Sequence, residues 1–109
     1  MNLPEFPFSA INWSDVESKE YNGDSGKAVW RTTFLGDVRI RLVDYSENYS
    51  ANHWCSKGHI LFILKGEMTT ELQDGREFYM TEGMSYLTGD DGIPHRSRTL
   101  KGARLLIID

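Results

Sequence analysis

Short strand-like segments separated by glycine-containing turns dominate the chain from residue 28 onward. Residues 38–42 alternate apolar and basic side chains, which is typical of a strand with one buried face, because neighbouring side chains point to opposite sides. Asp74-Gly75 lies between two such segments and predicts a tight hairpin. No stretch after residue 27 keeps a helical period, and strand signals recur every ~8–12 residues, so the sequence predicts an all-β sandwich or barrel. Further strands are expected at residues 28–35, 61–64, 67–72, 76–80 and 103–108, and the continuously apolar segment 61–64 is expected to be covered on both faces.

The first 27 residues lack this pattern and predict an N-terminal arm, followed by one barrel domain over residues 28–109. Pro4 and Pro7 interrupt the arm, and the turn-rich residues 23–26 close it. Residues 12–21 are expected to form a short helix or an extended segment. Apolar side chains are too frequent here for a free tail, so we expect the arm to dock on the barrel or on a second subunit.

Composition excludes several classes of protein. The 109 residues fit one domain, and 39% hydrophobic residues suffice for one core. A net charge of −4 and a pI near 5.3 argue against nucleic-acid partners, which require a basic face. The longest apolar run, 60–64, is far shorter than the ~20 residues that span a bilayer, and the first residues lack the pattern of a signal peptide. We therefore expect a cytoplasmic protein with no membrane partner.

Three histidines and a single cysteine are the chemically informative residues. One cysteine cannot form an intrachain disulfide. If residues 53–55 are extended, His53 and Cys55 point to one face. Residues 56–58 are then expected to form a hairpin loop with Gly58 in the left-handed region, which would place His59 opposite Cys55. His95 follows His59 by 36 residues, so only the tertiary fold can bring it near.

These residues resemble two motifs of the cupin superfamily. Residues 53–55, His59 and Gly66 resemble the first motif, which reads His-x-His, three or four residues, Glu, six residues, Gly. Gly83 and the run Gly92-Ile93-Pro94-His95 resemble the second motif, with one extra residue between its glycine and its histidine. The His-Trp-Cys run is similar to that of small single-domain "DHCW motif" cupins. The resemblance implies a double-stranded β-helix, or jelly-roll barrel, with a metal at its centre.

The resemblance implies a ligand set of His53, Cys55, His59 and His95, in which a cysteine replaces the second motif histidine and a histidine replaces the glutamate. Imidazole and thiolate ligands favour zinc, ferrous iron, nickel or copper over manganese, so the expected cofactor is one such divalent transition metal. Two coordination models stay open. Either all four residues close a tetrahedral His3Cys site, or Cys55 stays off the metal and leaves an open position.

Two classes of function follow from these models. The first is a metal-dependent enzyme that acts on a small polar molecule by dioxygenation or by Lewis-acid chemistry. Arg41, Tyr86 and Arg98 are its candidate substrate-binding residues, although arginines of this kind are more often solvated charges at a barrel rim. The second is a noncatalytic protein that binds or senses a metal or small ligand. Because small barrels have exposed edges, a homodimer is also expected.

Overall fold

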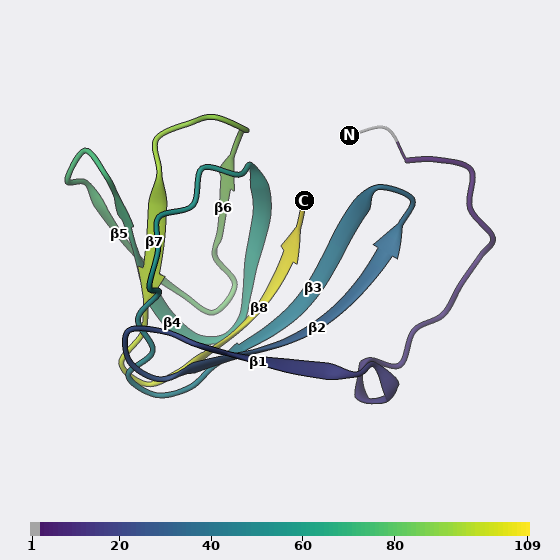
Figure 1. Cartoon of the computed structure of the whole chain (residues 1–109), viewed down its shortest axis with the longest axis horizontal. Helices are drawn as coiled ribbons and strands as arrows, with labels where there is room; N and C mark the ends of the chain where they lie inside the picture. Colours follow the sequence, from purple (N-terminus) through teal and green to yellow (C-terminus); the bar gives the residue numbers. More distant parts are fainter. Residues whose placement is uncertain (1–2) are drawn as a thin grey trace.

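The computed structural model describes residues 3–109, which form a β-barrel open at one end (Figure 1). Residues 1 and 2 of the expected arm lie outside this range. One turn of 3-10 helix, Trp13–Asp15, precedes the strands. The strands of the described residues are β1 (Ser18–Asn22), β2 (Lys27–Leu35), β3 (Val38–Tyr45), β4 (His59–Leu72), β5 (Glu77–Thr81), β6 (Ser85–Thr88), β7 (His95–Arg98) and β8 (Ala103–Ile108).

The long strand β4 joins two antiparallel sheets. Its first half pairs with β8 on one side and β6 on the other, and β8 continues through β3 and β2 to β1. Its second half pairs with β5 and β7. The register against β8 shifts between Ile63 and Lys65, and Gly66 follows with φ 86°. A bulge of this kind bends a strand, which lets β4 pass from one sheet to the other. The predicted all-β jelly-roll architecture is confirmed.

The local strand predictions are largely confirmed. Residues 28–35, 38–42 and 103–108 lie in β2, β3 and β8. Asp74-Gly75 sits in the tight turn between β4 and β5, where the Leu72 amide donates to the Arg76 carbonyl over 2.8 Å. The expectation that residues 61–64 are covered on both faces is wrong. Leu61 and Ile63 are buried, but Phe62 is 39% exposed, because β4 turns one face to the barrel interior and the other to the outside.

The core lies between the two sheets and is made by the inward-facing side chains. Its largest fully buried members are Leu61, Ile63, Met68, Leu105 and Val43. These residues alternate along β4, β8 and β3, as the period of two requires. This core fixes the start of β4, where His59 lies two residues before the buried Leu61.

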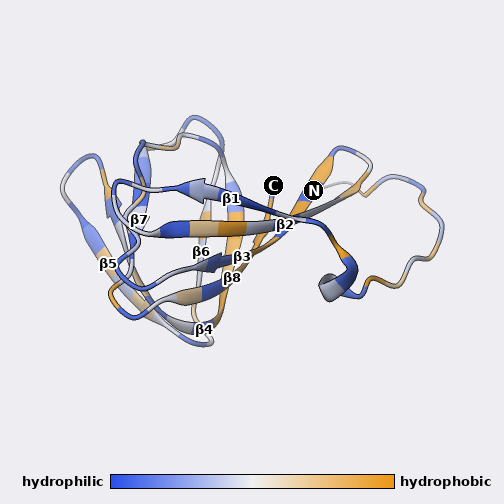
Figure 2. Ribbon diagram, turned by 60° about the horizontal axis from the view of Figure 1, so that its bottom comes forward, coloured by the Kyte–Doolittle hydropathy of each residue, from blue (hydrophilic) through white to orange (hydrophobic). Residues whose placement is uncertain are grey.

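The N-terminal segment runs outside the barrel, and Figures 1 and 2 both show it reaching away from the sheets. It returns near the turn between β2 and β3, where Pro4 packs against Gly36. Phe8 is fully exposed and Leu3 is 60% exposed, and Figure 2 shows hydrophobic stretches along the segment. Within the expected arm, β1 pairs with β2 over residues 18–22. No helix among residues 3–109 has the length and apolar character needed to cross a membrane.

Candidate metal centre

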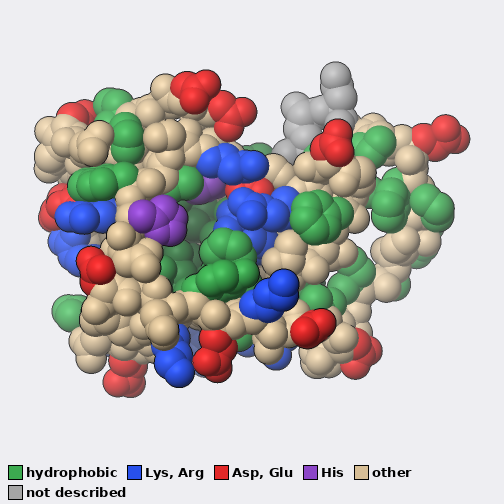
Figure 3. Space-filling model, viewed as in Figure 1, with side chains coloured by type: hydrophobic (Ala, Val, Ile, Leu, Met, Phe, Trp, Pro, Cys, Tyr) green, Lys and Arg blue, Asp and Glu red, His purple; other side chains and the backbone are tan. Residues whose placement is uncertain are grey.

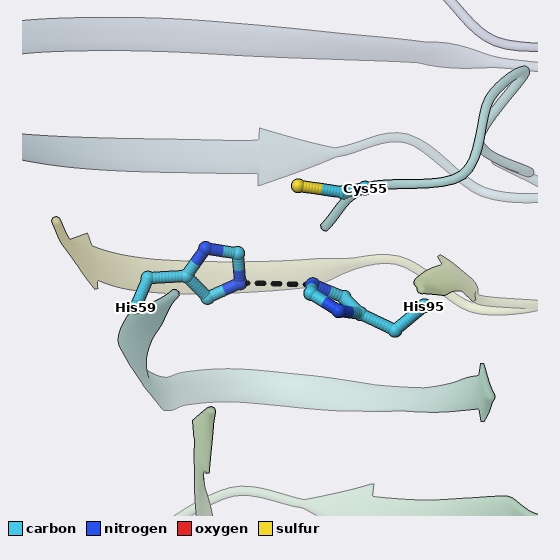
Figure 4. A group of neighbouring side chains, drawn as sticks. All are labelled: Cys55, His59 and His95. Atoms are coloured by element: carbon cyan, nitrogen blue, oxygen red, sulfur yellow. Dashed lines mark hydrogen bonds between the residues drawn. The ribbon is translucent and has the colours of Figure 1, made fainter. Parts of the chain in front are cut away.

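Cys55 and His95 are direct neighbours across an antiparallel bridge. The Cys55 amide donates to the His95 carbonyl over 2.8 Å, and the His95 amide donates back over 2.9 Å. Side chains opposite each other in such a pair point to the same face. His59 joins them from the first position of β4, and the ligand atoms of the three residues all lie within 4.8 Å of one another (Figure 4). The fold therefore brings together three residues that the sequence singles out.

The predicted hairpin at residues 56–58 is wrong, because Cys55 and His59 are not paired with each other. His59 pairs with Thr88 of β6, whereas Cys55 pairs with His95. Residues 56–58 instead cross between the two sheets and bind the loop after β6, where Asp90 Oδ1 accepts from the Gly58 amide over 2.8 Å. Gly58 does not have the expected positive φ. It is required by close approach, since a Cβ there would lie 2.5 Å from the Asp90 nitrogen.

The two imidazoles face each other through their Nε2 atoms, which are 3.2 Å apart. Burial, together with the nearby His95, lowers the pKa of His59 to about 4. Burial also lowers the pKa of His95, against the effect of a hydrogen bond from its ring to the Ile93 backbone. Both rings are therefore neutral at pH 7, the form in which imidazole binds metals.

A buried carboxylate lies behind His59. Asp109 Oδ2 is 3.7 Å from His59 Nδ1, and the Asp109 side chain is only 1% exposed. The same carboxylate accepts from Arg39 Nε at 2.8 Å and from Arg41 Nη2 at 2.8 Å. These arginines lower the pKa of Asp109 although burial acts in the opposite direction. At 3.7 Å Asp109 makes no hydrogen bond to His59 Nδ1, which has no partner within residues 3–109, but the negative charge favours a proton on Nδ1 and leaves Nε2 for a metal.

The donor set fits a transition-metal ion. Tyr86 places its hydroxyl 2.7 Å from His59 Nε2, and burial raises the Tyr86 pKa, so this hydroxyl is protonated and can donate. The His95 proton is held toward Ile93. Both Nε2 atoms thus face each other beside the Cys55 thiol, and a cation bound between them would take over the lone pairs that these hydrogen bonds use. Two imidazoles and a thiolate are ligands that zinc, iron, copper and nickel accept.

The other predicted site residues lie at different distances from this centre. His53 is exposed and its Nδ1 lies 2.8 Å from Asn52 Oδ1, so it is outside the three-residue cluster although it lines the same cavity. Arg41 also lines the cavity and is only 6% exposed, so it is not the solvated rim charge expected as the alternative. Arg98 points to the outside of the barrel, where it pairs with Glu77 at 3.1 Å, because it alternates with the buried Ser97. It does not line this cavity.

The centre opens into a cavity of about 180 Å³ that has charged side chains in its lining, here called the charged cavity. Arg39, Arg41, Lys57 and Arg96 line it, with Asp109 as the lining carboxylate. Figure 3 looks into this mouth and shows histidine side chains facing a group of Lys and Arg side chains. Arg41 stacks on the Trp30 ring at 4.5 Å, and its Nε has no hydrogen-bond partner within residues 3–109. The cavity therefore favours anionic or strongly polar groups.

Asp109 is the functional residue that sequence reasoning missed. The period of two in β8 contains the signal, because Leu105, Ile107 and Asp109 fall on one face if the alternation is continued by two residues. Register against β3 then sets Asp109 opposite Arg39, with paired backbone hydrogen bonds. That register could not be read from the sequence.

No protein-family model and no curated relative matches the sequence. Solved structures match over most of the chain. The polyketide cyclase RemF from Streptomyces resistomycificus superposes with a TM-score of 0.76 at 21% identity, covering 93% of this chain and 78% of that one. The structure of iron(II)-bound HppE superposes with a TM-score of 0.76 at 15% identity. The match covers 95% of this chain but 61% of the HppE chain, so this chain spans less than two thirds of that protein. A cupin-2 domain containing protein from Shewanella frigidimarina superposes with a TM-score of 0.60 at 15% identity, covering 73% of this chain and 78% of that one. At these identities the likeness concerns the fold.

Proposed function

We propose that this chain, which has the cupin fold, is a metal-dependent enzyme that acts on a small molecule bound at the barrel mouth. The observation that carries the proposal is the convergence of Cys55, His59 and His95, whose ligand atoms lie within 4.8 Å of one another at the edge of a cavity. Three protein ligands leave a coordination position for substrate or water, as in catalytic sites. The iron(II) in the structurally similar HppE supports metal binding at this fold.

In this proposal His59 and His95 bind the metal through Nε2 and Cys55 binds through its thiolate. The metal is zinc, ferrous iron, nickel or copper. When bound, it supplies Lewis-acid activation of a substrate oxygen or, if redox-active, chemistry with O2. Asp109 lies 3.7 Å from His59 Nδ1 and would orient the ring. A metal on His59 Nε2 would free the Tyr86 hydroxyl, which lies 2.7 Å from that atom, to donate a hydrogen bond to a substrate oxygen.

The arginines on the far side of the cavity bind the polar part of the substrate. Arg41 is buried and held by one bond to Asp109 and by the Trp30 ring. Its Nε has no hydrogen-bond partner within residues 3–109, so an anionic or carbonyl oxygen of the substrate would satisfy it. This favours a substrate with a carboxylate or another electron-rich oxygen group.

The second candidate is a noncatalytic metal-binding or metal-sensing protein. His53 favours it, since this residue lines the same cavity and could complete a closed His3Cys site. The local hydrogen bond from His53 to Asn52 must then rearrange. The metal content of a His53→Ala variant distinguishes the two candidates, because only the closed site uses His53 as a ligand.

The test is the metal content and metal affinity of purified variants. We expect His59→Ala, His95→Ala and Cys55→Ser to lose most of the bound metal, because each removes one of three ligands. Arg98→Ala, which removes a side chain on the outside of the barrel, is the control and should keep the wild-type content. An X-ray absorption-edge spectrum of the loaded protein reports the element and the sulfur ligand. Unchanged stoichiometry in both histidine variants would refute the assignment.

Alkylation of Cys55 gives an independent measurement. If Cys55 is a ligand, metal should slow its labelling and a chelator should restore the fast rate. Equal rates with and without metal would remove Cys55 from the ligand set. If His53→Ala also loses metal as completely as His59→Ala, the closed site replaces the open one.

We also propose that the protein forms a homodimer. The outer face of β4 carries Ile60, Phe62 and Leu64, which are 41%, 39% and 36% exposed, and Leu87 of β6 lies beside Ile60. The exposed apolar side chains of the N-terminal segment add a second surface that a partner copy would cover. Light scattering should give a dimer that Phe62→Asp weakens, and a monomeric wild-type protein at micromolar concentration would exclude it.

A further inference from the structure

A second, apolar hollow adjoins the metal centre. Its volume is about 510 Å³, compared with about 180 Å³ for the charged cavity. Tyr86 and His95 line both spaces, so two side chains of the centre form their common wall. A molecule in the hollow therefore ends next to the candidate metal ligands.

The hollow lies against the inner face of β5. Phe78 and Met80 share that face, opposite Thr70 and Met68 of β4. Met68 and Met80 are 0% and 4% exposed, whereas Phe78 is 47% exposed. An aromatic ring on the inner wall of a barrel normally packs into the core. At this end of the barrel the inner wall is left uncovered.

Other exposed apolar side chains surround the same space. Met84 is 45% exposed and Ile93 is 42% exposed, and both line the hollow. Arg76 also lines it, but its guanidinium pairs with Asp74 at 2.9 Å. A concave space of ~300–1,000 Å³ with apolar walls and a few polar groups at one end is typical of small-molecule sites.

We propose that this hollow binds the apolar part of the molecule whose polar group reaches the metal centre. The ligand class is then a compound with an alkyl or aryl body and one metal-binding oxygen group, whereas the sequence predicts a small polar molecule. The placement of the ligand's polar group at the metal rests on the proposed function. The placement of its apolar part rests only on the residues that line the hollow, so an experiment can contradict either placement without the other.

The length of an alkyl chain is the measurable variable. Alkyl hydroxamates, from acetohydroxamate to hexanohydroxamate, are titrated into the metal-loaded protein and followed by calorimetry. Each methylene that enters the hollow should raise the affinity about fourfold, because its transfer from water to an apolar site is favourable. The corresponding n-alcohols, titrated into the metal-free chain and followed by NMR, test the hollow without the metal.

Substitutions locate the effect. Phe78→Asp and Ile93→Asp place a charge on the wall and the rim, and either should abolish the dependence on chain length while the bound metal is retained. Two variants are used because Phe78 belongs to a strand and Ile93 to a loop. Phe34→Asp is the matched control, since Phe34 is 57% exposed on β2 and does not line the hollow.

The outcomes separate the two proposals. Hydroxamates that bind with an affinity independent of chain length overturn the hollow and leave the metal centre standing. A protein that binds no metal but still binds longer alcohols more tightly, with loss in Phe78→Asp, supports the hollow and removes the proposed function. Alcohols that bind without dependence on length in that protein overturn both. If the Phe34→Asp variant also loses the dependence of affinity on alkyl chain length, the hollow is not the site that binds the chain.

Discussion

Replacing Asp109 with asparagine removes a buried negative charge that two arginines share. The Asp109 carboxylate accepts from Arg39 Nε at 2.8 Å and Nη2 at 3.0 Å, and from Arg41 Nη2 at 2.8 Å. Its side chain is 1% exposed and that of Arg41 is 7% exposed. Asp109→Asn keeps the shape of the side chain but leaves the Arg41 guanidinium buried without a counter-charge.

The expected cost follows from this burial. Breaking a buried ion pair from one side destabilises a protein by about 3–5 kcal/mol. Because the asparagine oxygen can still accept one of these hydrogen bonds, we expect the lower end, about 3 kcal/mol. The same substitution removes the charge that faces His59 Nδ1 at 3.7 Å, and such outer partners contribute ~10–100-fold in metal affinity.

Asp44→Asn is the matched control. Asp44 also receives two bonds from one arginine, Arg104, at 2.7 and 3.1 Å, but its side chain is 33% exposed and that of Arg104 is 48% exposed. An exposed pair contributes at most ~1 kcal/mol. Urea unfolding of the metal-free variants measures the stability, and competition with a chromophoric chelator measures the metal affinity.

Two results would refute the reasoning. If Asp109→Asn and Asp44→Asn lose the same free energy of unfolding, burial of the Asp109–Arg41 pair does not decide its contribution. If Asp109→Asn lowers the stability but leaves the metal affinity unchanged, Asp109 supports the fold and does not orient His59.

Two further predictions concern the fold. Gly66→Ala should cost at least ~2 kcal/mol, because Gly66 has φ +86° and a Cβ would lie 2.2 Å from the Gly102 carbonyl oxygen. Gly75→Ala should cost less, since Gly75 has φ +98° with open space around it, and equal losses in denaturant titrations would contradict the steric argument. Partial burial raises the pKa of Glu67, but hydrogen bonds from Lys101, Thr99 and Leu100 outweigh it and hold this pKa below its ordinary value. The charged carboxylate therefore stabilises the fold above that ordinary value, and the contribution is lost as the pH falls through the lower folded-state pKa. Glu67→Gln should be less stable at pH 7 and should lose less stability on acidification, so parallel acid-unfolding curves for the two proteins would count against this.

Much of the barrel could be predicted because the deciding interactions are local. Alternation in 38–42 identifies a strand, since side chains of period two must separate an inner from an outer face. Asp74-Gly75 identifies a turn through the backbone freedom of glycine. The same local reasoning fails at residues 61–64, because an apolar run does not tell whether a second layer covers it.

The sequence by itself determined where most of the longer strands lie and that His53, Cys55, His59 and His95 are the candidate ligands, because strand period, turn type and ligand chemistry are properties of neighbouring residues. Only the tertiary structure decided how those residues meet. Cys55 pairs with His95 and not with His59, because residues 56–58 cross between two sheets and bind the loop after β6. Asp109 reaches His59 because the register of β8 against β3 sets it beside Arg39 and Arg41. Such pairings join residues far apart in the chain and depend on which strand edges come together, which no local pattern specifies.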